Sequence, residues 1–158
     1  MTVDPMTFRQ AAGMFATGVL VITTGKEGRF RAVTVNSFTT VSLEPTLLLF
    51  CLDNRSRTLP LLQESGTLTA NVLREDQESI SRMFASSKSE ATIDDVQYDL
   101  GLVGTPTIAG CLAHFQCRVV DNYVAGDHTV IIARVEEATF GEPGKPLIFF
   151  RGRYGLDT

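Results

Sequence analysis

The feature that most constrains the fold is a succession of short apolar or alternating segments, each bounded by a turn signal. Val19–Thr24 is β-branched and apolar, Phe30–Asn36 alternates between two faces, and Thr46–Leu52 is a continuous apolar run typical of a strand buried on both faces. Further strands are expected at Thr67–Leu73, Ile108–Val124, Thr129–Ala138 and Pro146–Phe150. The segments follow one another through tight turns and lack a regular strand–helix–strand rhythm. The pattern therefore predicts a mainly β chain, an antiparallel barrel or sandwich with flanking short helices.

A helix is expected at the N-terminus, over residues 4–17. Apolar residues recur there at i, i+4 and i+7 from Phe8, which is one face of a helix. Thr7 followed three residues later by Gln10 fits a capping box. Gly18 stands where a left-handed residue commonly ends a helix.

Two further helices are expected in the middle of the chain. Thr58–Glu64 fits a short helix interrupted at Pro60, and Asp76–Ala85 fits a longer one with Asp76 as its N-cap. Ser86–Gly104 is polar and irregular, which indicates a surface loop. No internal repeat, low-complexity tract or linker divides the chain, so residues 1–158 are expected to form a single domain.

Charge and composition exclude several classes of function. The 158 residues carry a net charge of −4 with no run of Lys or Arg, so no nucleic-acid role and no binding to an anionic membrane are expected. The longest apolar run, residues 47–52, is far too short to span a bilayer. Three cysteines without a CxxC spacing suit a reducing compartment, and no basic, apolar leader is visible, so a cytoplasmic protein is expected. Two histidines cannot make a three-histidine metal site, and no metal ligands are assigned.

Familiar catalytic motifs are also missing. The sequence contains no GxGxxG, GxxxxGK[ST], HExxH or GxSxG. Cys51, Cys111 and Cys117 have apolar neighbours, which favours small core side chains over nucleophiles. If the chain is an enzyme, a cofactor is expected to carry the chemistry.

Two polar segments could bind a ligand. Thr34–Ser42 holds five hydroxyls, an amide and a Phe, which could face a heteroaromatic ring or a phosphate, although hydroxyls are equally common on an ordinary β-edge. Cys51–Thr58 follows the apolar run and holds two Arg, a Ser and a Thr before a possible helix start. Guanidinium groups and helix-start N–H groups together would suit a phosphate, whereas the alternative is a solvated loop.

Two further features lie near the end of the chain. His128, in the Gly126-Asp-His turn, could point into a cleft, or the turn could be an ordinary one. His114 lies mid-strand and is interpreted as a surface or interface residue. The tail Phe149–Tyr154 holds two Phe, two Arg and a Tyr, which could cap a ligand mouth or simply pack as a terminal strand.

Taken in order, these segments resemble the short-chain flavin reductases, the reductase components of two-component flavin-dependent monooxygenases. The similarity begins in Phe15–Thr24 (FATGVLVITT) and continues through Val35–Pro45 (VNSFTTVSLEP) and Asn71-Val-Leu. It ends in Gly126-Asp-His128 and the Phe150-Arg-Gly-Arg-Tyr154 tail. The resemblance implies an FMN-binding antiparallel split β-barrel of Greek-key type with flanking short helices, and it spans nearly the whole chain.

The resemblance also implies a set of site residues. Residues lining the isoalloxazine would be Asn36, Ser37, Phe38 and Thr39. Residues along the ribityl chain and phosphate would be Cys51, Leu52, Asp53, Arg55, Ser56, Arg57 and Thr58, with Asn71, Ala85 and Ser86 nearby. His128 would contact the nicotinamide dinucleotide as the catalytic residue, and Arg151 or Tyr154 would border that site.

The implied activity is hydride transfer from NADH or NADPH to FMN or FAD, with the protein supplying orientation and hydrogen-bond donors. Reduced flavin would leave a homodimer and serve a separate monooxygenase, since a single barrel of this length has no room for a fused oxygenase. Three alternatives stay open: a flavoprotein that retains FMN as a prosthetic group, a non-catalytic flavin-binding module, and a purely structural dimerisation domain.

Overall fold

The computed structural model describes residues 2–156, in which strand is the commonest secondary structure. Two short elements precede the main body, α1 (Pro5–Ala12) and β1 (Thr17–Gly18). The next elements are β2 (Leu20–Lys26), β3 (Arg29–Val35), β4 (Phe38–Leu43), β5 (Thr46–Asp53), α2 (Thr58–Ser65) and β6 (Thr67–Val72). The middle of the chain forms η1 (Glu75–Gln77), α3 (Glu78–Ala85), η2 (Ile93–Asp95), β7 (Tyr98–Leu100) and β8 (Pro106–Ile108). The last elements are β9 (Ala113–Ala125), β10 (His128–Phe140), β11 (Ile148–Phe150) and β12 (Arg153–Tyr154).

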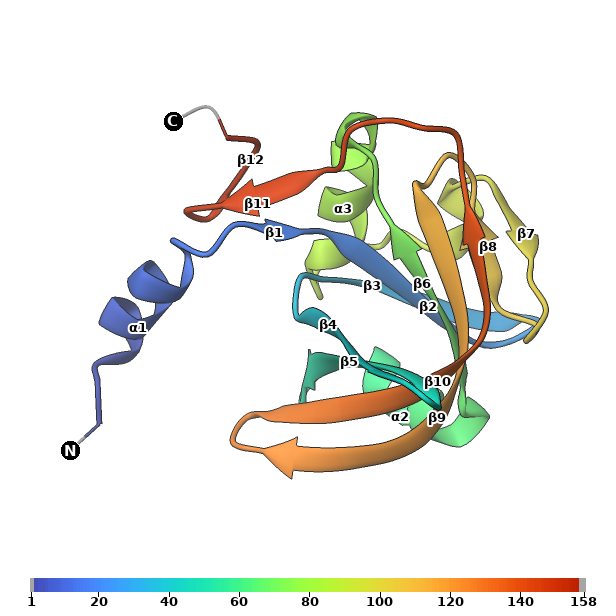
Figure 1. Ribbon diagram of the computed structural model, residues 1–158, viewed down its shortest axis with the longest axis horizontal. Helices are drawn as coiled ribbons and strands as arrows, with labels where there is room; N and C mark the ends of the chain where they lie inside the picture. Colours follow the sequence, from blue (N-terminus) through green and yellow to red (C-terminus); the bar gives the residue numbers. More distant parts are fainter. Residues whose placement is uncertain (1, 157–158) are drawn as a thin grey trace.

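Seven strands form one antiparallel sheet in the order β3-β2-β6-β9-β10-β5-β4. The sheet is strongly curled, and its outer strands β3 and β4 stay unpaired with each other, so the barrel is split (Figure 1). Three pairings join strands that are not consecutive: β2 with β6, β6 with β9, and β5 with β10. Such crossovers are typical of Greek-key connections. The mainly β, antiparallel split-barrel fold expected from the sequence is confirmed.

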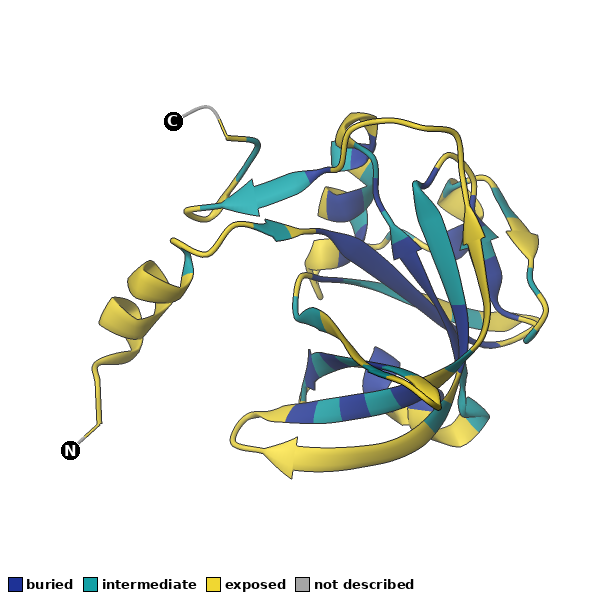
Figure 2. Ribbon diagram, in the orientation of Figure 1, coloured by how far each residue is buried: buried dark blue, intermediate teal, exposed yellow. Residues whose placement is uncertain are grey.

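Buried side chains gather in two clusters. The first lies inside the curl of the sheet and includes Phe50, Leu62 and Ile131, and the second lies between β2, α3 and η2 and includes Val21, Phe84 and Ile108. In Figure 2 both appear as buried segments of the central strands and of the helices beside them. Burial of α2 against the first cluster and of α3 against the second holds both short helices on the sheet, since helices of eight residues are marginal alone.

The prediction that Thr46–Leu52 is buried on both faces is wrong. Burial alternates along β5, with Leu48, Phe50 and Leu52 in the core and the residues between them only partly covered. A strand with this alternation faces the core on one side only.

The N-terminal helix is shorter than expected. It begins after Asp4, whose carboxylate accepts the N–H of Thr7 at 3.1 Å, so the capping box at Thr7 and Gln10 does not form. It ends at Ala12, and Gly18 is part of β1, which pairs with β11. No residue of α1 is buried, so no tertiary packing of its apolar stripe extends the helix to residue 17.

Three other boundaries differ from the expectation. Residues 108–124 are not one strand, because Gly110 takes a positive φ of 84° and separates β8 from β9. The turn lets His114 reach back, and its Nε2 lies 2.7 Å from the carbonyl oxygen of Ile108, so it is a partly buried structural residue. Asp76 is not an N-cap, since the 3₁₀ turn η1 precedes α3. Pro60 leaves α2 unbroken because it lies in the first turn, where no N–H is needed.

The segment expected to be an irregular loop, Ser86–Gly104, contains η2 and the strand β7, which pairs with β8 as a small separate sheet. No helix within residues 2–156 is long and apolar enough to cross a membrane.

Candidate functional site

A short loop with fixed geometry follows β5. The Asp53 carboxylate accepts the backbone N–H of Arg55 at 2.8 Å and bonds its guanidinium group at 3.1–3.2 Å. These hydrogen bonds lower the pKa of Asp53 to about 2, and the same contact raises the pKa of Arg55. The carboxylate is therefore ionised at neutral pH and holds the loop in one turn.

The loop leads directly into the N-terminus of α2. Ser56 Oγ accepts the N–H of Thr58 at 3.2 Å, and Arg57 stands at the N-cap position without a side-chain capping bond. The N-terminal end of a helix carries partial positive charge. Here it is flanked by the Arg57 guanidinium group, so this end of α2 favours an anion.

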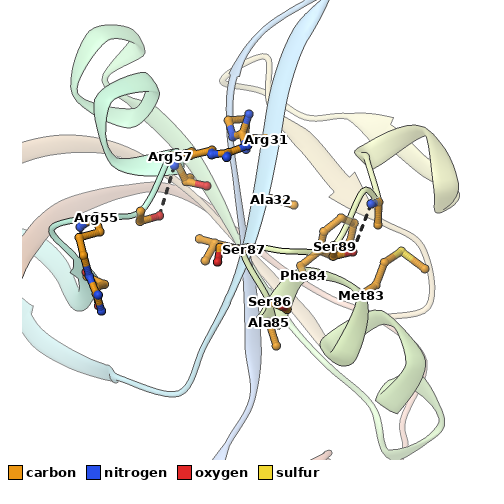
Figure 3. A pocket seen from close by; sticks show the side chains of 15 residues that line it. Arg31, Ala32, Arg55, Arg57, Met83, Phe84, Ala85, Ser86, Ser87 and Ser89 are labelled. Atoms are coloured by element: carbon orange, nitrogen blue, oxygen red, sulfur yellow. Dashed lines mark hydrogen bonds and ion pairs between the residues drawn. The ribbon is translucent and has the colours of Figure 1, made fainter.

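A pocket of about 470 Å³ opens beside this loop. Three segments form its wall: β3 around Arg31, the loop from Asp53 to Thr58, and the end of α3 with the serine-rich residues after it (Figure 3). Seven of the expected site residues line it: Asp53, Arg55, Ser56, Arg57, Thr58, Ala85 and Ser86. Three arginines against one aspartate make the pocket cationic, although the whole chain is acidic. An anionic ligand with polar and apolar parts is the kind of molecule that suits it.

The Gly126-Asp-His128 turn lies next to this loop. β10 pairs with β5 so that His128 stands opposite Asp53. Asn54 joins the two segments, since its N–H donates to the Asp127 carbonyl at 2.9 Å and its side-chain oxygen accepts from Thr129 Oγ1 at 2.6 Å. Strand pairing thus places His128 beside the pocket, although it does not line it.

The side chain of His128 is about half exposed. Its Nδ1 lies 2.7 Å from the Asp127 carboxylate, and this contact lowers the pKa of Asp127. The neighbouring carboxylate therefore holds the ring through Nδ1 and leaves Nε2 without a hydrogen bond to the described residues.

The segment expected to line the isoalloxazine lies outside the pocket. Ser37 Oγ donates to the Cys51 carbonyl at 3.0 Å and accepts its N–H at 2.9 Å, so it ties the segment to β5. The ring of Phe38 packs on Phe115 at 5.8 Å between centroids. Asn36 and Thr39 are exposed. The hydroxyl-rich segment thus runs from the end of β3 into β4, the two outer strands of the sheet, and its role in ligand binding stays a prediction.

The three cysteines differ in burial. Cys111 and Cys117 are core residues, as expected, and burial raises the pKa of each thiol to about 12. Cys51 is only partly buried on β5, and burial raises the pKa of its thiol, opposed by the Ser37 hydrogen bond. Its backbone, rather than its sulfur, meets the neighbouring strand.

Two of the expected cofactor residues are in the core. Leu52 is 2% exposed and belongs to the first cluster. Asn71 is fully buried: its Nδ2 donates to the Val21 carbonyl at 2.9 Å, and its Oδ1 accepts the N–H of Ile108 at 2.9 Å. Neither side chain lines the pocket; both contribute to the frame of the sheet, and their assignment as cofactor residues stays a prediction.

The tail forms a small sheet away from the pocket. β11 pairs with β1 and β12, and Tyr154 OH bonds Ser81 Oγ at 2.6 Å while Arg82 lies 4.8 Å over its ring. Arg151 adopts a positive φ of 54° and lies 5.2 Å over the ring of Phe150. Neither Arg151 nor Tyr154 lines the pocket.

The structure adds pocket residues that the sequence did not indicate. They are Arg31, Ala32 and Val33 on β3, Met83 and Phe84 on α3, and Ser87, Ser89 and Ala91 after it. The serine repeat after α3 was a usable signal, because hydroxyls next to a helix end can bind anions. Nothing local marks Arg31, which reaches the site only through the pairing of β3 with β2.

Comparisons with known proteins agree with this architecture. The model of the flavin reductase like domain family matches residues 12–156. The chain is 37% identical over 155 residues to an NADH-dependent flavin reductase of a Rhodococcus species, covering 96% of this chain and 86% of that protein. It is 38% identical to HsaB of Rhodococcus jostii, the reductase subunit of a flavin-dependent monooxygenase, and the match covers 96% of this chain and 77% of HsaB. Among solved structures, the chain resembles the Streptomyces globisporus NADH:FAD oxidoreductase SgcE6 in complex with NAD and FAD fragments. The TM-score is 0.91 at 36% identity, and the match covers 100% of this chain and 97% of that chain. The fold and these similarities together show that the chain belongs to the flavin reductase like domain family.

Proposed function

We propose that this protein transfers a hydride from NADH or NADPH to FMN or FAD and supplies the reduced flavin to a separate monooxygenase. The proposal rests on one observation above all, the cationic pocket at the N-terminus of α2 in a chain of this family. The related proteins support it, since one is named an NADH-dependent flavin reductase and another the reductase subunit of a monooxygenase.

The residues of the pocket fit a flavin phosphate. Ser56, Thr58 and Ser86 offer short hydroxyl donors, and Arg57 offers a guanidinium fork at the start of α2. Apolar side chains of Ala32, Met83 and Phe84 line the rest of the wall. Polar donors at one end and apolar contact at the other suit a molecule with a charged tail and an uncharged body.

A bound flavin supplies a ring that accepts a hydride from a stacked nicotinamide. This chain contributes position and polarity. The Ser37–Cys51 hydrogen bonds hold residues 36–39 against β5, so the segment expected to meet the flavin ring has a fixed position. His128, oriented by Asp127, binds the nicotinamide nucleotide at the mouth of the site. Arg151 and Tyr154 would border that nucleotide only across a subunit interface, because within one chain they lie apart from the pocket.

Release of the reduced flavin follows from the lining of the pocket. Arg55, Arg57, Ala85 and Ser86 are all exposed, so a bound phosphate keeps contact with water. Charge-assisted bonds at an exposed site contribute modestly to affinity. A ligand held in this way can dissociate and reach a second protein.

We propose a homodimer as the working form. Every residue of α1 is exposed or nearly so, and Met6, Phe8 and Phe15 expose most of their apolar side chains. Figure 1 shows α1 projecting away from the sheet. Contiguous exposed apolar groups of this kind mark association surfaces. Light scattering at several concentrations tests this proposal, and a monomer throughout contradicts it.

The cytoplasm is the proposed location, because NADH and NADPH are available there and the described thiols are all free. An assay with the purified protein needs no assumption about location.

The test of the function is a steady-state assay that crosses FMN and FAD with NADH and NADPH. We expect flavin-dependent oxidation of at least one nicotinamide, and passage of the reduced flavin through an ultrafiltration membrane under anaerobic conditions. Absence of oxidation in all four combinations contradicts the proposal. Reduced flavin that stays with the protein indicates a prosthetic group instead.

His128→Ala tests the assignment of the nicotinamide site. We expect the KM for the nicotinamide to rise about tenfold, the worth of one good polar contact, while the flavin Kd is unchanged. Asn122→Ala, on the neighbouring strand and outside the pocket, is the control. Equal effects of His128→Ala on both ligands contradict the assigned role.

A further inference from the structure

Two guanidinium groups in the pocket lack a carboxylate partner. Asp53 neutralises Arg55, but within residues 2–156 no carboxylate oxygen lies within 4.0 Å of the Arg31 or Arg57 side chain. Both side chains line the same pocket, and Figure 3 shows the Arg57 side chain pointing from its loop toward Arg31. The two positive charges converge at a helix N-terminus, which adds to their repulsion.

The register of β3 explains why Arg31 is there. Side chains two residues apart lie on the same face of a strand. Arg29 faces α2 and pairs with Glu64 at 3.9 Å near the C-terminal end of that helix. One pleat further along, Arg31 therefore faces the N-terminal end of α2, next to Arg57.

We propose that Arg31 and Arg57 form a diphosphate subsite that makes FAD the preferred flavin of this protein. The inference rests on the proposed function and names the substrate within it. Arg57, with Ser56 and Thr58, binds the phosphate nearest the flavin, and Arg31 binds the second phosphate, which FAD has and FMN lacks.

Charge complementarity supports this assignment. Each phosphate of a diphosphate diester carries one negative charge, and each of the two unpaired guanidinium groups carries one positive charge. Arg57 and Arg31 come from different elements, the loop before α2 and β3, so they can meet neighbouring phosphates of one ligand. The terminal phosphate of FMN carries close to two negative charges at neutral pH and can draw both guanidinium groups, so the comparison of FAD with FMN decides between one phosphate and two.

The diphosphate could belong to FAD or to the nicotinamide dinucleotide, and the experiment separates the two. Apo protein is titrated with FAD, FMN and riboflavin by fluorescence, and the KM for NADH is measured with riboflavin as acceptor. Riboflavin has no phosphate, so it reports the ring site alone. The riboflavin assay also separates the proposed function from the subsite. If the wild-type protein fails to oxidise NADH with any flavin, the proposed function is contradicted, whereas the binding titrations still test the subsite.

We expect Arg31→Gln to weaken FAD binding about tenfold, FMN binding less than about threefold, and riboflavin binding not at all. Arg57→Gln should weaken both FAD and FMN. Arg29→Gln is the matched control, since it removes an arginine from the same face of β3 outside the pocket and should change none of the three.

Three results would overturn the inference. Equal weakening of FAD and FMN by Arg31→Gln places Arg31 at the terminal phosphate. A raised KM for NADH with unchanged FAD binding places the nicotinamide diphosphate there. Unchanged binding of every ligand means that Arg31 is only a solvated side chain.

Discussion

Replacing Asn71 with Ala should destabilise the fold and leave the flavin site intact. Asn71 lies on β6 and joins three strands: Nδ2 donates to the Val21 carbonyl on β2, and Oδ1 accepts the N–H of Ile108 on β8. Nδ2 also lies 3.2 Å from Thr23 Oγ1. The side chain is 0% exposed, so water cannot replace these partners.

The expected loss of folding free energy follows from the backbone groups that lose their hydrogen-bond partner. A buried N–H or carbonyl that loses its partner costs about 1–3 kcal/mol, so the Ile108 N–H and the Val21 carbonyl together cost about 3 kcal/mol. The cavity adds to this cost. For a protein of this size, about 3 kcal/mol lowers Tm by roughly 6–12 °C.

The assay is urea unfolding at one fixed protein concentration, because association shifts apparent stability. Asn36→Ala is the control: Asn36 is the other asparagine among the expected cofactor residues, but it is exposed and makes only a 3.3 Å hydrogen bond to Thr17. We expect Asn36→Ala to change the free energy of unfolding by less than about 0.5 kcal/mol. If Asn71→Ala unfolds like the wild type but binds flavin weakly, the structural role is refuted.

Two further outcomes follow from the electrostatics. In the native protein we expect iodoacetamide to alkylate Cys51 faster than Cys111 and Cys117, because the latter two are buried and their thiol pKa values are raised to about 12. Peptide mass spectrometry after timed quenching measures the three alkylation rates. Equal rates for the three thiols contradict this expectation. Arg55→Ala should raise the pKa of Asp53 from about 2 toward its ordinary value of 3.8, followed by carboxyl NMR titration. Because the folded-state pKa of Asp53 is depressed, the stabilisation from its contact with Arg55 is fully present above about pH 4 and is lost as the pH falls through about 2. An Asp53 pKa that is the same in Arg55→Ala as in the wild type contradicts the assigned hydrogen bonds.

Much of the fold and part of the site could be predicted from the sequence. Strands such as Thr67–Leu73 and Thr129–Ala138 have local β patterns that match β6 and β10 within a few residues. The cationic loop of the pocket was also predictable, because Arg55, Ser56 and Arg57 are neighbours in the chain and lie between a strand and a helix. Features of this kind depend on residues a few positions apart.

Other features depend on contacts between distant segments. The isolated stripe from Phe8 onward predicts a helix as far as residue 17, yet α1 stops at Ala12, since nothing within residues 2–156 buries it. Asn71 has the composition of a ligand-binding residue, and only the pairing of β6 with β2 buries it. A polar side chain becomes structural or functional according to its neighbours in space.

The sequence by itself determined most of the strand segments, the net negative charge, the cationic loop and the family. Tertiary structure decided which of these meet. The pairing of β10 with β5 places His128 opposite Asp53, and the twist and register of β3 place Arg31 at the end of α2 beside Arg57. The physical reason is that side-chain periodicity is a local property, whereas strand register is set by long-range packing, and a shift of one residue would turn Arg31 to the opposite face.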